Sequence, residues 1–209
     1  MNTKIINKIF ETFNSKESSP KTELTFANDY TLLVAVVLSA QSTDVQVNKA
    51  TMPLFKVVKT PSDMIKLGEG GLIKYVKSIG LYRTKTRNVI RLSEMLIEKY
   101  KSKIPSSFEE LKTLPGVGNK TAKIILNAVF DQPTIAVDTH VFRVSRRLGL
   151  TKKDSIPTVE KDLEKIIPKK WKPKAHHWLV LHGRYICKAR KPLCDKCLVK
   201  KYCEYFKIL

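Results

Sequence analysis

Apolar residues recur every three or four positions along nearly the whole chain, which is the spacing of one face of an α-helix. The clearest sets are Val45, Met52 and Phe55; Val89, Leu92 and Leu96; and Val159, Leu163, Ile166 and Ile167. A further stripe near the N-terminus consists of Ile5, Ile6, Ile9, Phe10 and Phe13. These patterns predict a succession of amphipathic helices.

Alternation of apolar and polar residues, which marks a half-buried strand, is almost absent. Only the apolar run 31–40 and the segment 134–137 have strand character, and the first follows Asn28 and Asp29, which are good helix caps. Prolines and glycines divide the remaining chain into short helices. We therefore predict an all-α fold.

One pair of short helices is joined by a turn that contains two glycines. Ser106 and Ser107 are each followed three residues later by a glutamate, as in a capping box, so a helix should begin there and end at Leu114. A second helix is predicted over 120–130. Residues 106–130 thus have the pattern of a helix-hairpin-helix, although a plain helical hairpin with a glycine turn has the same pattern.

The turn of this hairpin has the sequence PGVGN at 115–119. Glycines allow the backbone to approach a phosphate closely, and the first amides of the following helix point outward at the positive end of its dipole. Such a turn grips a DNA backbone without reading its sequence. Gly116, Val117 and Gly118 are therefore candidate DNA contacts.

Two polar residues near the hairpin are candidates for chemistry. Lys120 lies in the first turn of the second helix, where the helix dipole disfavours a cation, so its amine should lose a proton more readily than an ordinary lysine amine. A neutral amine can form a Schiff base, whereas a charged one binds phosphate. Asp138 has the place of a helix N-cap, and a carboxylate there can also stabilise a cation that forms on a sugar.

All four cysteines lie close together near the C-terminal end, at Cys187, Cys194, Cys197 and Cys203. Clustered thiols in a cytosolic protein indicate a metal site rather than disulfides. Zinc modules usually separate two cysteine pairs by roughly 12 to 20 residues, whereas here all four form one short wrap, so the spacing favours a 4Fe-4S cluster over zinc. Lys188, Arg190 and Lys191 lie between the first two cysteines and form a basic loop suited to phosphate contact.

The amino-acid composition indicates what kind of partner the protein binds. The chain of 209 residues carries a formal charge of +20, and its 43% hydrophobic and 28% charged residues exclude fibrous and disordered classes. This charge favours nucleic acid, with anionic lipid or ribosomal RNA as alternatives, although a coding bias toward lysine would give the same excess. The longest apolar run, 32–38, is too short to cross a bilayer, and the N-terminal segment lacks an apolar signal core, so we expect a cytoplasmic protein associated with the nucleoid. No heptad pattern or long strand edge calls for a partner subunit, so we expect a monomer.

Taken together, these features resemble the endonuclease III family of the helix-hairpin-helix DNA glycosylase superfamily, nearly from end to end. The matching segments are LSAQSTD at 38–44, IGLY at 79–82, LPGVGNKTA at 114–122, VDTH at 137–140, HHW at 176–178, LHGR at 181–184 and the four-cysteine pattern. One departure is Asn119, where the family usually has arginine. This change would weaken a phosphate contact and leave the chemistry intact.

The resemblance implies two helical lobes with DNA in the cleft between them. Residues 23–132 would form a six-helix barrel that carries the hairpin. Residues 1–22 and 133–209 would form a discontinuous iron-sulfur lobe, with the cluster loop at 187–203. The 4Fe-4S cluster would shape the basic loop and make no bond in the reaction. The implied partner is duplex DNA that contains oxidised pyrimidines or abasic sites.

The resemblance also implies roles for the two polar candidates. Lys120 would displace the damaged base and form an imine with the opened deoxyribose, after which β-elimination cuts the strand. Asp138 would stabilise the oxocarbenium-like transition state and assist proton transfer. These roles define a bifunctional DNA glycosylase and abasic-site lyase of base excision repair.

Further residues would hold the DNA. The family extrudes the damaged nucleotide, and by position Gln41 would fill the vacated space while Leu81 wedges the opposite strand. Without the family, both are ordinary surface residues. His140 and Lys191 complete the predicted DNA contacts, although packing or a backbone hydrogen bond is the more ordinary role for a histidine.

Two other functions fit part of this pattern. An adenine-mismatch glycosylase of the same superfamily shares the hairpin, the aspartate and the cluster, but that branch lacks a lysine at the position of Lys120. A non-catalytic DNA-binding module with a structural metal would explain the hairpin and the charge equally well. The presence of Lys120 and Asp138 together favours the bifunctional enzyme over both.

Overall fold

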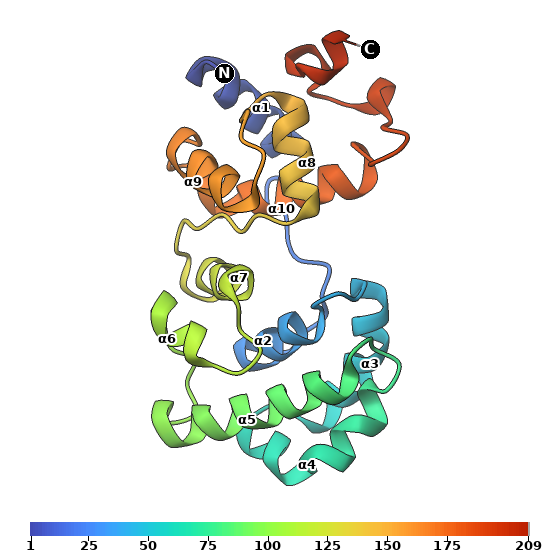
Figure 1. Cartoon of the computed structure of the whole chain (residues 1–209), viewed down its shortest axis with the longest axis vertical. Helices are drawn as coiled ribbons and strands as arrows, with labels where there is room; N and C mark the ends of the chain where they lie inside the picture. The colour runs from blue at the N-terminus through green and yellow to red at the C-terminus, as the bar shows by residue number, and fades with distance from the viewer. Residues whose placement is uncertain (209) are drawn as a thin grey trace. The chain divides into compact units, whose positions relative to one another are not determined.

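The computed structural model describes residues 1–208 and is all-helical over that range, which confirms the predicted fold class (Figure 1). The α-helices are α1 Thr3–Lys16, α2 Asp29–Leu38, α3 Asp44–Val57, α4 Pro61–Val76, α5 Tyr82–Tyr100, α6 Phe108–Thr113, α7 Asn119–Phe130, α8 Thr139–Leu148, α9 Ile156–Ile166 and α10 Lys172–Tyr185. Short 3-10 helices follow at η1 Cys194–Lys196, η2 Lys200–Tyr202 and η3 Tyr205–Ile208. No helix in the described part of the chain is long and apolar enough to cross a membrane.

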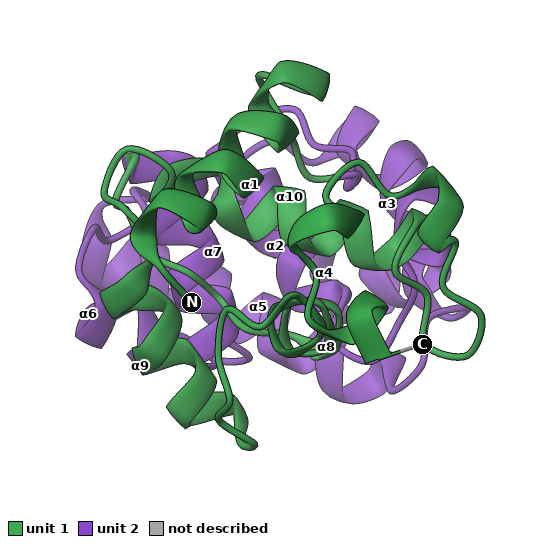
Figure 2. Cartoon of the chain, turned by 90° about the horizontal axis from the view of Figure 1, so that it is seen from above, with its two compact units in different colours: residues 1–22, 131–209 green, residues 23–130 purple. Residues whose placement is uncertain are grey.

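The chain divides into two compact units, coloured separately in Figure 2. Unit 2 contains Glu23–Phe130 and therefore α2 to α7. Unit 1 combines Met1–Thr22 with Asp131–Leu209, so that α1 packs with the C-terminal helices. Each unit has its own cluster of buried apolar side chains.

The apolar run with strand character becomes α2, a helix of unit 2 that is buried on all sides. Asn28 Oδ1 accepts a hydrogen bond from the backbone amide of Thr31 at 3.0 Å. In return, the backbone amide of Asn28 donates to the Thr31 hydroxyl at 2.9 Å. This capping box starts the helix. Every residue from Tyr30 to Leu38 is buried, which explains why the segment shows no helical periodicity.

Helix α3 departs from the predicted stripe. Val45 and Met52 are 78% and 56% exposed, whereas Val47, Ala50 and Leu54 face the core. Phe55, the third member of the predicted set, is buried as expected, so the buried face of α3 includes Phe55 but not Val45 or Met52. In α5, by contrast, the predicted set Val89, Leu92 and Leu96 is completely buried.

In unit 1, the buried face of α1 packs into an aromatic cluster. Phe10 contacts Trp171 and Trp178 at ring-centroid distances of 6.4 and 6.0 Å, and Phe13 lies 5.2 Å from His182. Ile5, which was predicted on the same stripe, is 37% exposed. Aromatic burial of this kind gives the short N-terminal helix a stable position.

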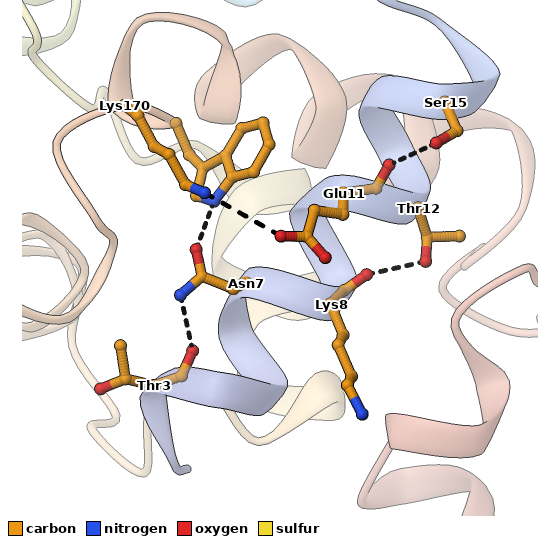
Figure 3. Close-up of polar contacts among 8 residues, drawn as sticks. Thr3, Asn7, Lys8, Glu11, Thr12, Ser15 and Lys170 are labelled. Carbon is orange, nitrogen blue, oxygen red and sulfur yellow. Dashed lines mark hydrogen bonds and ion pairs between the residues drawn. The ribbon is translucent and has the colours of Figure 1, made fainter.

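Polar contacts fasten the rim of α1 to the segment before α10 (Figure 3). The Trp171 indole donates to Asn7 Oδ1 at 2.8 Å, and the Asn7 amide donates to the Thr3 carbonyl at 3.1 Å. Lys170 lies 3.9 Å from Glu11, but both side chains are more than half exposed. The indole hydrogen bond therefore contributes more than the exposed ion pair.

Candidate functional site

The hairpin turn lies between α6 and α7, as predicted. Ser107 Oγ accepts from the Glu110 amide at 3.1 Å and starts α6, so Ser107 rather than Ser106 is the N-cap. The Val117 amide bonds to the Leu114 carbonyl at 3.0 Å and closes the turn. Residues 116–118 are held between the two helices, with Val117 buried and both glycines exposed.

Gly116 is required by the geometry of this turn. Its φ is +81°, and a Cβ atom there would lie 3.0 Å from Val37 Cγ1 and 3.2 Å from Asn88 Cβ. Gly118 differs, because a Cβ atom there would meet nothing within 4 Å. Gly116 thus serves the packing of the hairpin on α2 and α5, whereas Gly118 leaves open space for an approaching phosphate.

Lys120 is an exposed residue in the first turn of α7. The Ala122 amide bonds to the Gly118 carbonyl at 2.9 Å, so the amides before Ala122 have no i−4 carbonyl within the helix. The start of α7 therefore has the character of an anion site with a lysine in it. The amine is accessible to a large substrate.

Asp138 is the N-cap of α8, in the other unit. Its Oδ1 accepts from the amides of His140 and Val141 at 2.9 and 2.8 Å, and the apolar residues 135–137 before it are buried. The carboxylate is half-buried and held in one orientation by the helix end. The capping role predicted for Asp138 is confirmed.

Gln41 and Leu81 each occupy a turn in unit 2. Their φ values are 54° and 57°, in the left-handed region that non-glycine residues rarely adopt. Both are exposed, and Leu81 is 61% exposed despite its apolar side chain. A left-handed backbone at both turns and an exposed leucine directly before α5 are features of a recognition surface.

His140 lies on α8 where that helix packs against α10. A Cβ atom added at Gly183 would lie 2.9 Å from His140 Cβ, which shows how closely the two helices approach. The His140 Nδ1 atom lies 3.2 Å from Arg143 Nη2. His140 is half-buried: part of its side chain is covered by packing and by the contact with Arg143, and part is exposed to solvent.

The four cysteine side chains line one cavity in the C-terminal segment. Its other walls are mainly apolar and consist of Leu148, His182, Ile186, Pro192, Leu193, Lys200, Tyr205 and Phe206. No set of three or more His, Cys, Asp or Glu side chains within residues 1–208 is gathered around a single ion position. Four thiols on the wall of one apolar cavity are a donor set that fits an iron-sulfur cluster.

Two of these thiols have raised pKa values. Burial is the main cause that raises the pKa of Cys197 to about 11; a backbone hydrogen bond opposes it, and the neighbouring thiols add to it. Burial also raises the pKa of Cys203, against two backbone hydrogen bonds. Metal binding at this cavity must therefore displace protons from the thiols.

Arg147 joins this cavity to the basic loop. Its guanidinium donates to the carbonyls of Lys188 and Ala189 at 2.7 and 2.8 Å, and Nη1 lies 3.6 Å from Cys187 Sγ. One turn earlier, Arg143 donates to the carbonyls of Gly183 and Cys187 at 2.8 and 3.0 Å. Lys191 is exposed in the loop that these arginines hold.

The sequence assigned no role to Arg143 or Arg147. Their spacing of four residues on one face of α8, directly after the Asp138 cap, is a signal that was available. It did not show that both guanidinium groups serve the carbonyls of a distant loop. Lys85 was also overlooked, because nothing in its spacing marks it as buried.

A family model described as HhH-GPD superfamily base excision DNA repair protein matches residues 34–169. The chain is 57% identical to endonuclease III of Rickettsia felis over 206 residues, which are 99% of this chain and 97% of that protein. It is 48% identical to endonuclease III of Escherichia coli K12 over 186 residues, covering 89% and 88% of the two chains.

The fold is likewise similar to a solved structure of a trapped covalent intermediate between endonuclease III and DNA. The TM-score is 0.90 at 44% sequence identity, and the match covers 100% of this chain and 98% of that one. A second similar structure, with the same TM-score and identity, is a non-covalent complex of endonuclease III with DNA.

Proposed function

The chain belongs to the HhH-GPD superfamily of base excision DNA repair proteins, and from this membership we propose the reaction and the residues that perform it. It is a bifunctional DNA glycosylase and abasic-site lyase that removes oxidised pyrimidines from duplex DNA. The observation that carries this proposal is Lys120, an exposed amine at the start of α7 in a chain similar to a protein trapped covalently on DNA.

Lys120 acts as the nucleophile. Its amine lone pair forms a bond to C1′ of the damaged nucleotide, and the bond from C1′ to the base nitrogen breaks, with the base leaving as an anion that takes up a proton. The sugar ring then opens to an imine on Lys120. The imine acidifies the C2′ proton, and its loss expels the 3′ phosphate, so that the strand is cut by β-elimination.

Asp138 stabilises the positive charge that develops on the sugar and takes part in moving the proton of the Lys120 amine. Its N-cap hydrogen bonds to His140 and Val141 support this role, because they hold the carboxylate in place before substrate arrives. The cap thus gives the same side chain a folding role and a chemical role.

DNA is gripped through its backbone and probed by two side chains. The exposed turn at 116–118 and the basic loop that contains Lys191 bind phosphates, and His140 adds a contact from α8. Gln41 fills the place of the extruded nucleotide, and Leu81 wedges the opposite strand. The exposure of the Gln41 and Leu81 turns supports these assignments.

Cys187, Cys194, Cys197 and Cys203 hold a 4Fe-4S cluster. The cluster, when bound, supplies a rigid support for the loop and no bond-making step. The apolar cavity that the four thiols share supports this assignment. Residues 23–132 and the combination of 1–22 with 133–209 serve as the barrel and iron-sulfur domains of an enzyme that works on the bacterial chromosome in the cytoplasm.

The proposal is tested with duplex DNA that carries one thymine glycol, by measuring base release and strand cleavage separately. The wild-type protein should release the base and cut on the 3′ side of the site. Activity confined to a duplex with an adenine mismatch would indicate the related mismatch glycosylase. DNA binding without any reaction would indicate a non-catalytic module.

The role of Asp138 is tested by a pair of substitutions. Asp138→Asn keeps an oxygen acceptor for the N-cap but removes the charge, whereas Asp138→Ala removes both, at a cost of about 1 kcal/mol in unfolding free energy. Both should slow base release by about 10²- to 10³-fold. If Asp138→Asn were as active as the wild type, Asp138 would be a cap and nothing more.

A further inference from the structure

Lys85 is a buried lysine that none of the roles above uses. It lies in the first turn of α5 and is only 5% exposed. Its Nζ donates to Ser42 Oγ at 2.9 Å. Lysine is almost never buried without a partner, and burial here lowers its pKa.

This hydrogen bond links α5, which begins directly after the Leu81 turn, to the turn that contains Gln41, and both turns are proposed to probe DNA. Ser42 directly follows Gln41. On the other side, the Lys85 amide bonds to the Leu81 carbonyl at 3.0 Å, so the backbone of Lys85 is anchored to Leu81. The side chain of Lys85 therefore connects the Leu81 turn to the Gln41 turn.

The turns also approach each other through their backbones. A Cβ atom added at Gly80 would lie 3.9 Å from the Gln41 carbonyl oxygen and 4.0 Å from Ser42 Oγ. Gln41 and Leu81 both have left-handed φ values, which persist only where surrounding contacts enforce them. A hydrogen bond between the turns is such a contact.

Packing alone does not explain a lysine at this position. The first turn of a helix disfavours a cation, and a methionine would fill the same space without the cost of desolvating an ammonium group. The polar end is therefore what the position requires. Its one hydrogen bond partner among the described residues is the Ser42 hydroxyl.

We propose that Lys85 is a positioning residue that ties the Gln41 turn to the Leu81 turn, so that both side chains enter the duplex as one rigid unit. This inference rests on the proposed function, because it assumes that these two turns probe DNA. Lys85 itself touches neither the damaged base nor the reacting sugar. Its effect is on nucleotide extrusion, which precedes the chemistry.

Excision of a damaged base and cleavage at a preformed abasic site should depend on Lys85 to different degrees. Extrusion of a paired nucleotide requires both turns at once, whereas a preformed abasic site lacks the base and unpairs more readily. Loss of the tie should therefore slow excision of thymine glycol from duplex DNA more than it slows cleavage at an abasic site. A residue that only stabilises the fold would affect both reactions alike.

The experiment measures single-turnover rates on both duplexes for Lys85→Met, Ser42→Ala and the double variant. We expect Lys85→Met to slow excision about 10- to 100-fold, the factor expected for one hydrogen bond to a charged group, and to slow abasic-site cleavage less than about 3-fold. Because Lys85 and Ser42 act through one bond, the double variant should be no slower than Lys85→Met. Ser42→Thr, which keeps the hydroxyl, should retain wild-type excision.

Lys99→Met is the matched control, since it removes an exposed lysine at the other end of α5. Thermal unfolding of all variants shows whether the fold is intact. Equal slowing of both reactions, or fully additive effects of Lys85→Met and Ser42→Ala, would overturn the inference, as would wild-type excision by Lys85→Met. If the wild-type protein processed neither duplex, the proposed function would fail first, and this inference with it.

Discussion

At the scale of single residues, the two glycines of the hairpin turn have separate functions. Gly116→Ala places a Cβ atom against Val37 and Asn88 at a φ of +81°. We expect this substitution to lower the unfolding free energy by about 2 kcal/mol, from left-handed strain and tight contacts together. Denaturant unfolding measures the change.

Gly118→Ala is the matched control for Gly116→Ala, because the position has open space around it. Its stability should remain within about 0.5 kcal/mol of the wild type. Its affinity for duplex DNA should fall, since the methyl group stands between the backbone and a phosphate. Equal stability losses at the two positions would contradict this division of functions.

His177 makes the stability of unit 1 depend on pH. Burial, together with the neighbouring His176, lowers its pKa to about 4. Because this folded value lies below the unfolded value of about 6.5, protonation favours unfolding. The stabilising contribution is complete above pH 6.5 and is lost as the pH falls toward 4.

We expect wild-type stability to decrease by roughly 1 to 2 kcal/mol between pH 7 and pH 5 through this residue. His177→Gln should reduce the dependence of the unfolding free energy on pH, even if it lowers stability at every pH. Chemical denaturation at several pH values measures both effects. If the unfolding free energy of His177→Gln depended on pH as strongly as that of the wild type, other groups would cause the pH dependence.

The sequence predicts the role of a residue well when that role depends only on nearby residues, as for a helix cap. The sequence identifies the cap at Asp138 and limits the cap of α6 to Ser106 or Ser107, of which Ser107 caps the helix in the structure. The role of Lys85 could not be predicted, because its burial and its bond to Ser42 join positions 43 residues apart. Local patterns carry no information about such a contact.

At the scale of elements, α8 holds the basic loop through Arg147. Arg147→Lys keeps the positive charge but cannot donate to the Lys188 and Ala189 carbonyls together, as the guanidinium does. We expect affinity for duplex DNA to fall about 3- to 10-fold, because the loop must be ordered on binding. Fluorescence anisotropy with an abasic-site analogue measures the affinity.

Arg146→Lys is the control for this substitution. Arg146 is the adjacent residue of α8, and its guanidinium lies over the Phe142 ring at 5.4 Å rather than in the loop. Its substitution should leave DNA affinity unchanged. A similar loss in both variants would show that the lower affinity does not come from the contacts between Arg147 and the loop, and unchanged affinity in Arg147→Lys would show that Arg147 contributes charge alone.

Helix positions were predicted well where one face is apolar and the other polar. Helix α5 shows this, since its predicted apolar set is buried. The prediction was wrong for Val45 and Met52 in α3, because surface apolar residues interrupt the pattern that marks the buried face. The run at 31–40 was placed correctly only through its cap, since burial on all sides removes the helical period.

At the scale of the whole molecule, a charge of +20 predicts that DNA binding depends strongly on salt. Each phosphate contact adds about 0.9 to the slope of log affinity against log salt concentration. Lys191→Ala should reduce this slope by about 1 and weaken binding to every sequence alike. Titrations at several salt concentrations measure the slope.

Lys165→Ala, at an exposed lysine of α9, controls for the loss of one charge from the molecule. It should leave the slope within error of the wild type. If Lys165→Ala and Lys191→Ala changed the slope equally, general charge rather than the basic loop would govern binding.

The most direct test of the proposed chemistry is borohydride trapping on duplex DNA that carries one thymine glycol. Reduction of an imine joins protein to DNA permanently, and a denaturing gel separates the joined species. Lys120→Arg keeps the cation but has no amine that can become neutral. The wild-type protein should form the covalent species, and Lys120→Arg should bind the duplex without forming it. Trapping by Lys120→Arg at the wild-type level would show that Lys120 is not the nucleophile.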